Sequence, residues 1–387
     1  MKWAKTDNCN PHRTKVGEDN EDGLDGQESE ATPRDRNLLP PLPIAALLHD
    51  GCQMAKFTYA AIRGAAFMQY PKRSQYKHAK KKKYRIRNWR AYTEALRRRG
   101  DLTVWFDVDA IEEWQADKTG KPGGQRKYAD VAIETGLVVR MIYKLAYRQT
   151  QGLLKSIATL LGLGIEIPDY STLCRRSKAL RKKLQVPKDA GNQPIHLMID
   201  STGLKIHVGS ARKPPKKRAW RKLHLAVGRQ TGNIVATELT ASGARDASRV
   251  PALLTQIETS LASVSADCAY DKEPVYEAIE GHSPGRRTRV IIPPQRHAVV
   301  SPQSKTAMQD RNRHIRAIER HGRREWHKTS GATERSMVEN AVYRYKTIIG
   351  SEMRARTLAR QRVEHRIGCE ILNKMTAMEM PDSYCVT

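Results

Sequence analysis

The hydrophobic pattern of the chain changes its period near residue 194. Before that point, apolar residues recur at helical spacing in three segments, YADVAIETGLVVRMIYKLA, RQTQGLLKSIATLLGLG and DYSTLCRRSKALRKKL. The second segment runs into glycine, and Asp169 or Ser171 can cap the start of the third, which are ordinary helix stop and start signals. The pattern predicts a helical region over residues 128–184.

After residue 194, short apolar runs alternate with helical stretches. PIHLMID predicts a strand that ends at Asp200, and RKLHLAVGRQTGNIVATELT predicts a hairpin of strands 221–228 and 233–239. DASRVPALLTQIETSL, with Asp246 as its N-cap, and EPVYEAIEG predict helices. SVSADCAYD and RVIIPP predict strands, and a basic irregular region then precedes a last helix. We expect an α/β fold with a mixed sheet and helices on both faces.

The segments that precede residue 128 carry weaker patterns. Residues 1–36 are polar and locally acidic, so we expect them to be disordered. The run KRSQYKHAKKKKYRIRNWR at 72–90 is the densest basic stretch, either a solvated linker or an arm that contacts phosphates. NWRAYTEALRRRG then predicts a short helix ended by Gly100, and LTVWF predicts a short strand.

The charge of the chain narrows its possible partners. Its 387 residues hold 69 Lys and Arg against 41 Asp and Glu, a formal net charge of +28. Such a chain is attracted to polyanions, with nucleic acid the first candidate and an acidic membrane surface the second. No apolar run approaches the ~18 residues of a spanning helix, and the start lacks a signal peptide's apolar centre. We therefore expect an intracellular protein that is not embedded in a membrane.

Other classes of site find little support. The six cysteines are scattered without a CxxC pair, so neither a zinc site nor a disulfide framework is indicated. His196, His207 and His224 flank predicted strands but lie at no metal-ligand spacing. We interpret them as ordinary core or surface histidines.

The third predicted helix has a basic face. Leu173, Leu180 and Leu184 form its apolar stripe. The other face is basic and includes Arg175, Arg176, Lys178 and Lys182. A helix, a short turn and a basic helix form the helix-turn-helix pattern, although surface helices with a basic face are also common. We expect these four side chains to contact DNA.

Three carboxylates of the α/β region can converge on one point. Asp200 and Asp267 end predicted strands, where sites are built in such sheets, although each could instead be a turn or cap residue. Asp271 stands four residues after Asp267 and is interpreted as the cap of the next helix. The third acid, Glu339, lies in the last helix, within ERSMVENAVYRYK.

That helix places Glu339 beside two bases. At about 100° per residue, Arg335 and Lys346 fall within about 40° of Glu339, next to an apolar stripe that includes Val338 and Val342. The stripe could be an ordinary solvated ion-pair face. Three carboxylates, however, are what Mg²⁺ or Mn²⁺ prefers, and two such ions can support displacement at a phosphodiester. We therefore expect Asp200, Asp267 and Glu339 to be metal ligands.

The same motifs resemble a known family. IDSTGL at 199–204, ADCAYD at 266–271 and RSMVENAVYRYK at 335–346 occur in the order seen in DDE transposases of the bacterial insertion-sequence four and five superfamily, closest to the five group. The last motif matches the family's Arg, three residues, Glu, six residues, Lys. Resemblance extends over roughly residues 84–350. There are two departures, Ala332 where the family has Tyr and Cys268 where it often has Gly.

The resemblance implies a fold and a reaction. It implies a ribonuclease-H-like catalytic domain that cuts and joins DNA at the ends of a mobile element with divalent metal, taken here as two Mg²⁺ or Mn²⁺ ions. Asp200, Asp267 and Glu339 would then be catalytic, together with Arg335 and Lys346, which would hold the phosphates of the cleaved strand or balance developing charge. The partners would be double-stranded DNA at element ends and target, bound by a homo-oligomer. The expected location is the bacterial cytoplasm, at the nucleoid.

The expected domains follow from the pattern and the resemblance together. They are a disordered extension over 1–71, a basic arm with a helix-turn-helix-like DNA-binding domain over 72–190, a catalytic domain over 191–352 and a helical tail over 353–387. Two alternatives to a transposase stay open, a different nuclease of the same fold, such as a resolvase, and a DNA-binding protein that has lost catalysis.

Overall fold

The computed structural model describes residues 83–386 except 107, 119, 121, 181–183, 185–192, 208–219 and 302–305. Predictions for the extension, for most of the basic arm and for Lys182 lie outside the described residues. In the described part, no helix combines the length and the apolar character that crossing a bilayer requires.

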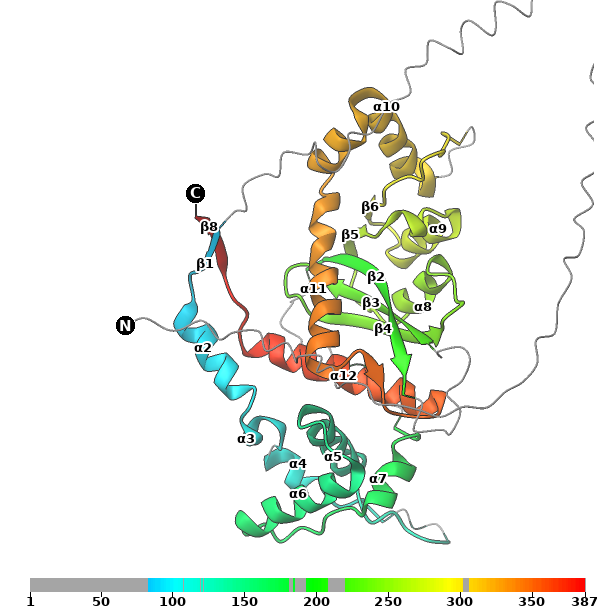
Figure 1. The fold of residues 1–387 in the computed structure, drawn as a ribbon. Coiled ribbons are helices and arrows are strands. Elements are labelled where there is room, and N and C mark those ends of the chain that lie inside the picture. Colours follow the sequence, from blue (N-terminus) through cyan, green and yellow to red (C-terminus); the bar gives the residue numbers. More distant parts are fainter. Residues whose placement is uncertain are drawn as a thin grey trace, which may run out of the picture. The chain divides into compact units, whose positions relative to one another are not determined.

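A mixed sheet forms the centre of the molecule (Figure 1). Its strands are β2 (Ile195–Ile206), β3 (Trp220–Gly228), β4 (Ile234–Ala241), β5 (Leu261–Ser265) and β6 (Arg289–Ile291), in the order β4-β3-β2-β5-β6. The first three pair antiparallel, and β5 and β6 extend the sheet in parallel on the other side of β2. This is the ribonuclease-H-like order, so the predicted fold class is confirmed. A short β7 (Glu352–Met353) pairs with the far end of β2.

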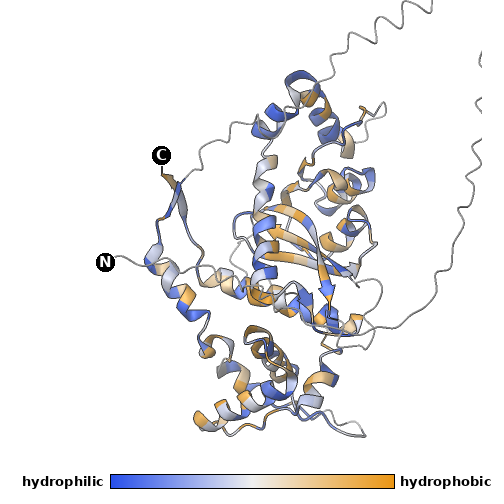
Figure 2. Ribbon diagram, viewed as in Figure 1, coloured by the Kyte–Doolittle hydropathy of each residue, from blue (hydrophilic) through white to orange (hydrophobic). Residues whose placement is uncertain are grey.

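Alternating side chains of β2 separate two cores. Leu197 and Ile199 pack on one face with α8 (Val250–Leu254) and α9 (Glu273–His282). Met198 and Leu204 pack on the other face, with side chains from α11 (Ser336–Arg344) and α12 (Leu358–Met378). Figure 2 shows the strands of the sheet as predominantly hydrophobic. The expectation of helices on both faces is therefore confirmed.

The helices before the sheet are shorter than the pattern predicts. They are α2 (Trp89–Arg98), α3 (Leu102–Trp105), α4 (Val108–Glu112), α5 (Asp130–Ile142), α6 (Tyr147–Leu160) and α7 (Tyr170–Arg176). The prediction of a strand at LTVWF is wrong, because Asp101 caps α3 by accepting a hydrogen bond from the Thr103 N–H. The predicted helix 169–184 ends at Arg176, and buried Leu180 is carried by a turn.

The last helix is a core element. In α12, Val363, Ile367 and Ile371 pack with α5, whereas Cys369 and Leu372 pack under the sheet. The helix predicted as a tail therefore joins the helical region to the central sheet. After it, β8 (Ser383–Val386) pairs antiparallel with β1 (Lys83–Ile86).

The basic region before α11 is not irregular as expected. Residues Gln309–Thr329 form α10, which is kinked at Gly322, where φ is 79°. Across the kink, the indole N–H of Trp326 donates to His314 Nδ1 over 3.0 Å, and both side chains are buried. The sequence did not predict this contact between the two arms of α10, because the kink interrupts the helical periodicity.

Candidate active site on the central sheet

Strand pairing brings two of the expected acids together. Met198 in β2 pairs with Ser265 at the end of β5. Asp200 stands two residues after Met198, and Asp267 stands two residues after Ser265. Both lie on the same face as Met198, because side chains alternate along an extended segment. The prediction that Asp200 ends its strand is wrong, since β2 continues to Ile206 through its pairing with β3. The strand that ends next to Asp200 is β5, so the chain leaves the sheet just before Asp267.

An arginine connects the sheet to α11. The Arg335 guanidinium donates from Nη1 to Asp200 Oδ2 over 3.1 Å and from Nη2 to Glu339 Oε1 over 2.7 Å. Arg335 and Glu339 face one another as the helical stripe predicts, because residues four apart lie on one side of a helix. The contact with Asp200 spans 135 positions of sequence. Two of the three expected acids therefore share one cation.

The environment of Asp200 is strongly anionic. Burial raises the pKa of the Asp200 carboxyl, and the negative charges of Asp267 and Glu339 act in the same direction. A backbone hydrogen bond from the Ser201 N–H, at 2.8 Å, and the charge of Arg335 oppose that rise. The three carboxylates are thus close enough to influence each other's protonation.

The two aspartates after β5 have different surroundings. Asp267 is half-buried and accepts a hydrogen bond from the Ala269 N–H at the start of a 3₁₀ turn. Asp271 is buried, and the prediction that it caps α9 is wrong, because Lys272 occupies that N-cap position without any side-chain cap. Its carboxylate instead accepts from Arg311 Nε at 2.9 Å and from the Tyr276 hydroxyl at 3.0 Å. A backbone N–H, of Gln295, supplies a further hydrogen bond at 2.9 Å.

Asp246 also differs from its expected role. It stands at the N-cap of the turn before α8, but its side chain makes no cap hydrogen bond. Its carboxylate lies 3.2 Å from the Lys222 ammonium, a partner on β3. The prediction of a capping Asp246 is therefore wrong, because a lysine of the neighbouring strand takes its carboxylate.

The end of the signature helix departs from regular α-helix. Residues Tyr345–Ile349 form a π-helical turn, which is wider than an α-turn, so Lys346 no longer follows the simple α-helical stripe. Ala332, at the position of the family tyrosine, opens the 3₁₀ turn that leads to Arg335. Its N–H donates to Ser330 Oγ at 3.2 Å.

The donor set suits a hard divalent cation. As they stand, the described residues contain no three acidic, histidine or cysteine side chains grouped closely enough to hold a metal ion. Yet Asp200, Asp267 and Glu339 offer only carboxylate oxygens, the donors that Mg²⁺ and Mn²⁺ take. The Glu339 side chain is 55% exposed, so it can change rotamer at little cost. The chemistry of these residues therefore fits a divalent ion that replaces Arg335 as their shared cation.

Comparison with known proteins identifies the family. Two family models, each described as a transposase DDE domain, match residues 97–209 and 191–372. The chain belongs to the DDE transposases. It is thus an enzyme that cuts and transfers DNA strands with divalent metal ions, and the insertion-sequence four and five group is consistent with both models. A cryo-EM structure of the piggyBac transposase synaptic complex with hairpin DNA is also similar, at 10% identity and a TM-score of 0.34, covering 70% of this chain and 73% of that one.

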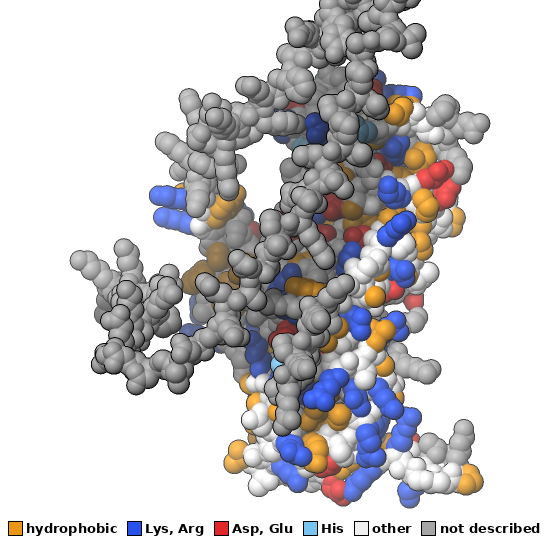
Figure 3. Space-filling view, turned by 45° about the vertical axis from the view of Figure 1, so that its right-hand side comes forward, with side chains coloured by type: hydrophobic (Ala, Val, Ile, Leu, Met, Phe, Trp, Pro, Cys, Tyr) orange, Lys and Arg blue, Asp and Glu red, His pale blue; other side chains and the backbone are white. Residues whose placement is uncertain are grey.

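The residues of the transposase that were predicted to contact DNA differ in how exposed and how engaged they are. Arg175 and Lys178 are exposed, but Lys178 lies in the turn after α7 and not on a helix. Arg176 bonds to the Asp130 carboxylate and to the carbonyl of Tyr128, so it holds α7 against the start of α5. Figure 3 shows lysine and arginine side chains gathered over the lower part of the face in view.

One exposed aromatic of the transposase was missed in the sequence. Tyr343 lies one turn after Glu339 on α11, about 40° from it around the helix, and its relative exposure is 68%. Tyr345, two residues further on, is instead buried in the core. The available signal was the spacing of four residues from Glu339, which places Tyr343 on the side of the acid.

Proposed function

We propose that this transposase acts on the inverted-repeat ends of an insertion sequence, and that Asp200, Asp267 and Glu339 are its catalytic residues, holding two Mg²⁺ or Mn²⁺ ions. The observation that supports this most directly is the Arg335 bridge. It joins Asp200 of the sheet to Glu339 of α11, while Asp267 adds its charge from the turn after β5. Two acids from distant segments that share one base, with a third acid beside them, are not expected of an ordinary surface ion-pair face.

The bases of the signature helix have roles in this proposal. Bound divalent ions would activate the attacking oxygen and stabilise the leaving oxygen of the phosphodiester. With its carboxylates neutralised by those ions, the Arg335 guanidinium can turn its two donors to a phosphate, for which its planar fork is suited. Lys346, half-buried near the end of the same helix, would contact the neighbouring phosphate.

The helical region supplies a candidate for recognition of the element ends. Arg175 and Lys178 are exposed, and they stand on and just after a helix that follows α6 in a helix-turn-helix-like order. Arg176 would orient this unit through Asp130 and not touch DNA. We propose that a homo-oligomer assembles on paired ends at the bacterial nucleoid, with residues 128–184 as the reader.

A strand-transfer assay tests the proposal. The full chain would be incubated with Mn²⁺, DNA that carries the inverted repeats flanking its gene, and a target plasmid. The wild type should join end to target. Glu339→Gln should lose cleavage and joining but keep DNA binding, because a carboxamide keeps the shape and loses the charge that holds metal. Glu280→Gln, an exposed acid on α9, is the matched control.

The outcomes of that assay separate the alternatives. Hydrolysis without joining would favour a nuclease, and DNA binding without either reaction would favour a protein that has lost catalysis. Full cleavage by Glu339→Gln at saturating Mg²⁺ would remove Glu339 from the catalytic set.

A further inference from the structure

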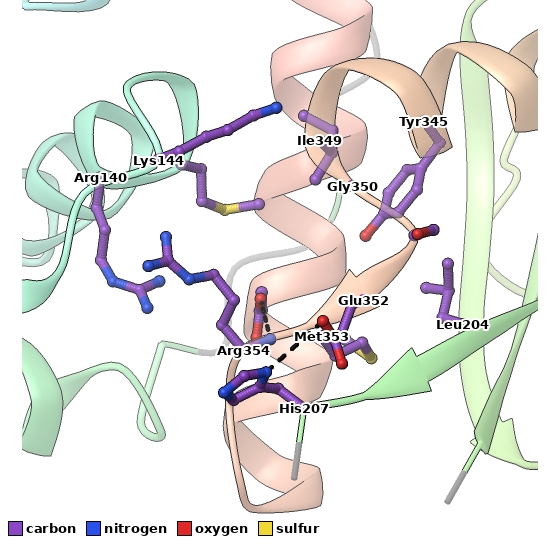
Figure 4. Close-up of a pocket in the computed structure, with 13 residues that line it drawn as sticks. Arg140, Lys144, Leu204, His207, Tyr345, Ile349, Gly350, Glu352, Met353 and Arg354 are labelled. Atoms are coloured by element: carbon purple, nitrogen blue, oxygen red, sulfur yellow. Dashed lines mark hydrogen bonds and ion pairs between the residues drawn. The ribbon is translucent and has the colours of Figure 1, made fainter. Parts of the chain in front are cut away.

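A cavity of about 450 Å³ opens between α5, the far end of β2 and the segment that joins α11 to α12. Three basic side chains, Arg140, Lys144 and Arg354, line it together with His207, Glu352 and Glu364 (Figure 4). None of them belongs to the proposed catalytic set. We call it the Arg140 cavity.

Arg140 is a buried cation with unused hydrogen-bonding capacity. Its relative exposure is 8%, and its guanidinium stacks on the Tyr147 ring at 4.3 Å from the ring centre. Its Nε has no hydrogen-bond acceptor among the described residues. Stacking occupies the face of a guanidinium and leaves its N–H edge available to an anion. A buried donor of this kind is costly unless something accepts from it.

A second guanidinium faces the same space. Arg354 donates from Nη1 to the Leu145 carbonyl at 3.1 Å. Burial lowers the pKa of Arg354, and the positive charge of Arg140 acts in the same direction. Figure 4 shows both guanidinium groups in one part of the cavity. Two like charges held together in this way favour a shared counterion.

The acids of the cavity are already engaged. Glu364 accepts from the backbone N–H groups of Arg354 and Ala355, at 2.8 and 2.7 Å. Glu352 lies at 3.6 Å from His207 Nδ1. Both carboxylates have donors other than Arg140, so they do not replace an external anion there.

Lys144, the third basic residue of the cavity, has a strained backbone conformation. Lys144 has φ of 53°, and it follows α5 with its N–H bonded to Met141 O and the next N–H bonded to Arg140 O. This is a Schellman motif with lysine at the left-handed position, where glycine is favoured. The end of α6 has the same pair of hydrogen bonds, because the Gly162 N–H donates to Thr159 O and the Leu163 N–H donates to Ala158 O. There the left-handed position is occupied by Gly162. A lysine kept where the same chain elsewhere uses glycine indicates a role for its side chain.

The cavity lies along the strand that carries Asp200. Leu204, which lines it, is on the same face of β2 as Asp200 and four residues further on, about 13 Å at ~3.3 Å per residue. Tyr345, at the start of the π turn after α11, lines it too. A DNA strand that reaches Asp200 could place a backbone phosphate there, since phosphates recur at about 3.4 Å of helix axis per strand.

We propose that the Arg140 cavity is a phosphate-binding site, in which the Arg140 and Arg354 guanidinium groups hold one phosphate group. The exposed Lys144 side chain, whose ammonium points toward Ile349 in Figure 4, would turn to join them. That phosphate belongs either to the backbone of bound DNA or to a free phosphate compound. The site stands on its own residues and does not depend on which acids are catalytic, so its binding can be measured without any cleavage.

Thermal unfolding of the full chain tests the site. Phosphate would be titrated against chloride at matched ionic strength, and the rise in Tm compared between variants, because phosphate also stabilises proteins without binding specifically. Lys144→Gly should fold at least as well as the wild type and weaken phosphate about tenfold. Arg140→Met should raise Tm without phosphate and abolish the specific rise. Arg286→Ala, which removes an exposed charge elsewhere, should behave as wild type.

A second arm identifies the source of the phosphate. Binding of a 20-base-pair duplex to the full chain would be measured in EDTA, which removes the divalent ions that cleavage needs, with and without Lys144→Gly. Weaker duplex binding by the lysine variant assigns the site to a DNA backbone phosphate, and unchanged duplex binding with lost phosphate response assigns it to a free phosphate compound. Equal phosphate responses in the wild type, Lys144→Gly and Arg140→Met, with equal duplex affinity, would overturn the proposal.

Discussion

The Nε of Arg311 lies 2.9 Å from Oδ1 of Asp271, and both side chains are largely withdrawn from solvent. This ion pair connects the turn after β5 to α10, 40 positions later in the chain. It gives Asp271 a partner in the protein core, whereas Asp267, four residues earlier, accepts a hydrogen bond from the local turn. This difference in surroundings is the reason why we propose Asp267, and not Asp271, as a metal ligand.

Asp271→Asn should therefore destabilise the protein strongly. Removing one charge of a buried ion pair costs about 3–5 kcal/mol, which corresponds to a fall in Tm of roughly 4–6 °C for a chain of this size. Asp267→Asn should change Tm by less than about 2 °C and abolish metal-dependent cleavage. Calorimetry and a cleavage assay on both variants would show this. A stable, inactive Asp271→Asn beside an active Asp267→Asn would exchange their roles.

The periodicity of the sequence predicted the elements whose signals are local. The hairpin of β3 and β4 and the helix α9 follow their patterns closely. Two boundaries failed where tertiary packing overrode local preference. β2 continues through Ser201, Thr202 and Gly203, which look like a turn, because β3 pairs with all three. The third predicted helix ends at Arg176, before most of its basic residues, because Leu180 packs in the core after a turn.

The candidate site was predictable only in part, for a similar reason. The spacing of Arg335 and Glu339 on a helix is readable from the sequence, and so is the presence of Asp200 and Asp267 near strands. That Arg335 reaches Asp200, that Asp271 is taken by Arg311, and that Lys144 adopts a left-handed conformation all depend on packing. No local sequence pattern predicts those contacts.

Arg335→Gln should lower stability in a metal-dependent way. In EDTA the variant leaves Asp200 and Glu339 without their shared cation, at a cost of about 1 kcal/mol because Glu339 is half-exposed, or roughly 1 °C in Tm. Millimolar Mn²⁺ should close that gap, since a divalent ion neutralises the same carboxylates. Tm would be measured in both buffers, with Arg356→Gln, an exposed arginine, as control. An undiminished deficit in Mn²⁺ would argue against a metal at these acids.

His365 should make the fold sensitive to acid. Burial lowers the pKa of this α12 histidine from 6.5 to about 4. The unfolded chain therefore binds a proton below pH 6.5 that the folded chain refuses until pH 4, so stability is full above pH 6.5 and falls as the pH drops through that window. The loss is about 3 kcal/mol, from 1.36 kcal/mol per pKa unit. The fall in Tm between pH 6.5 and 4 should be shallower for His365→Asn, and equal slopes would show that this histidine does not titrate as described.

Tyr343 should hold unpaired bases beside the proposed catalytic acids. Its ring is exposed on α11 one turn from Glu339, and the chain has Ala332, in the turn before α11, at the position of the tyrosine usual in the family. Base stacking on an aromatic ring is worth about 1–3 kcal/mol and is independent of sequence. Tyr343→Ala should therefore weaken binding of ends with a single-stranded overhang by roughly 5- to 100-fold.

The substrate and the substituted residue both control that measurement. A fully paired duplex offers no free base, so Tyr343→Ala should bind it as the wild type does. Tyr343→Phe keeps the ring and loses only the hydroxyl, so it should retain affinity for the overhang, whereas a hydrogen-bonding role of the hydroxyl would make it as weak as Tyr343→Ala. Fluorescence anisotropy with the two DNAs at fixed salt separates these cases, because salt alone changes the phosphate contribution to affinity. Equal losses on both DNAs would mean that Tyr343 contacts the backbone and does not stack on a base.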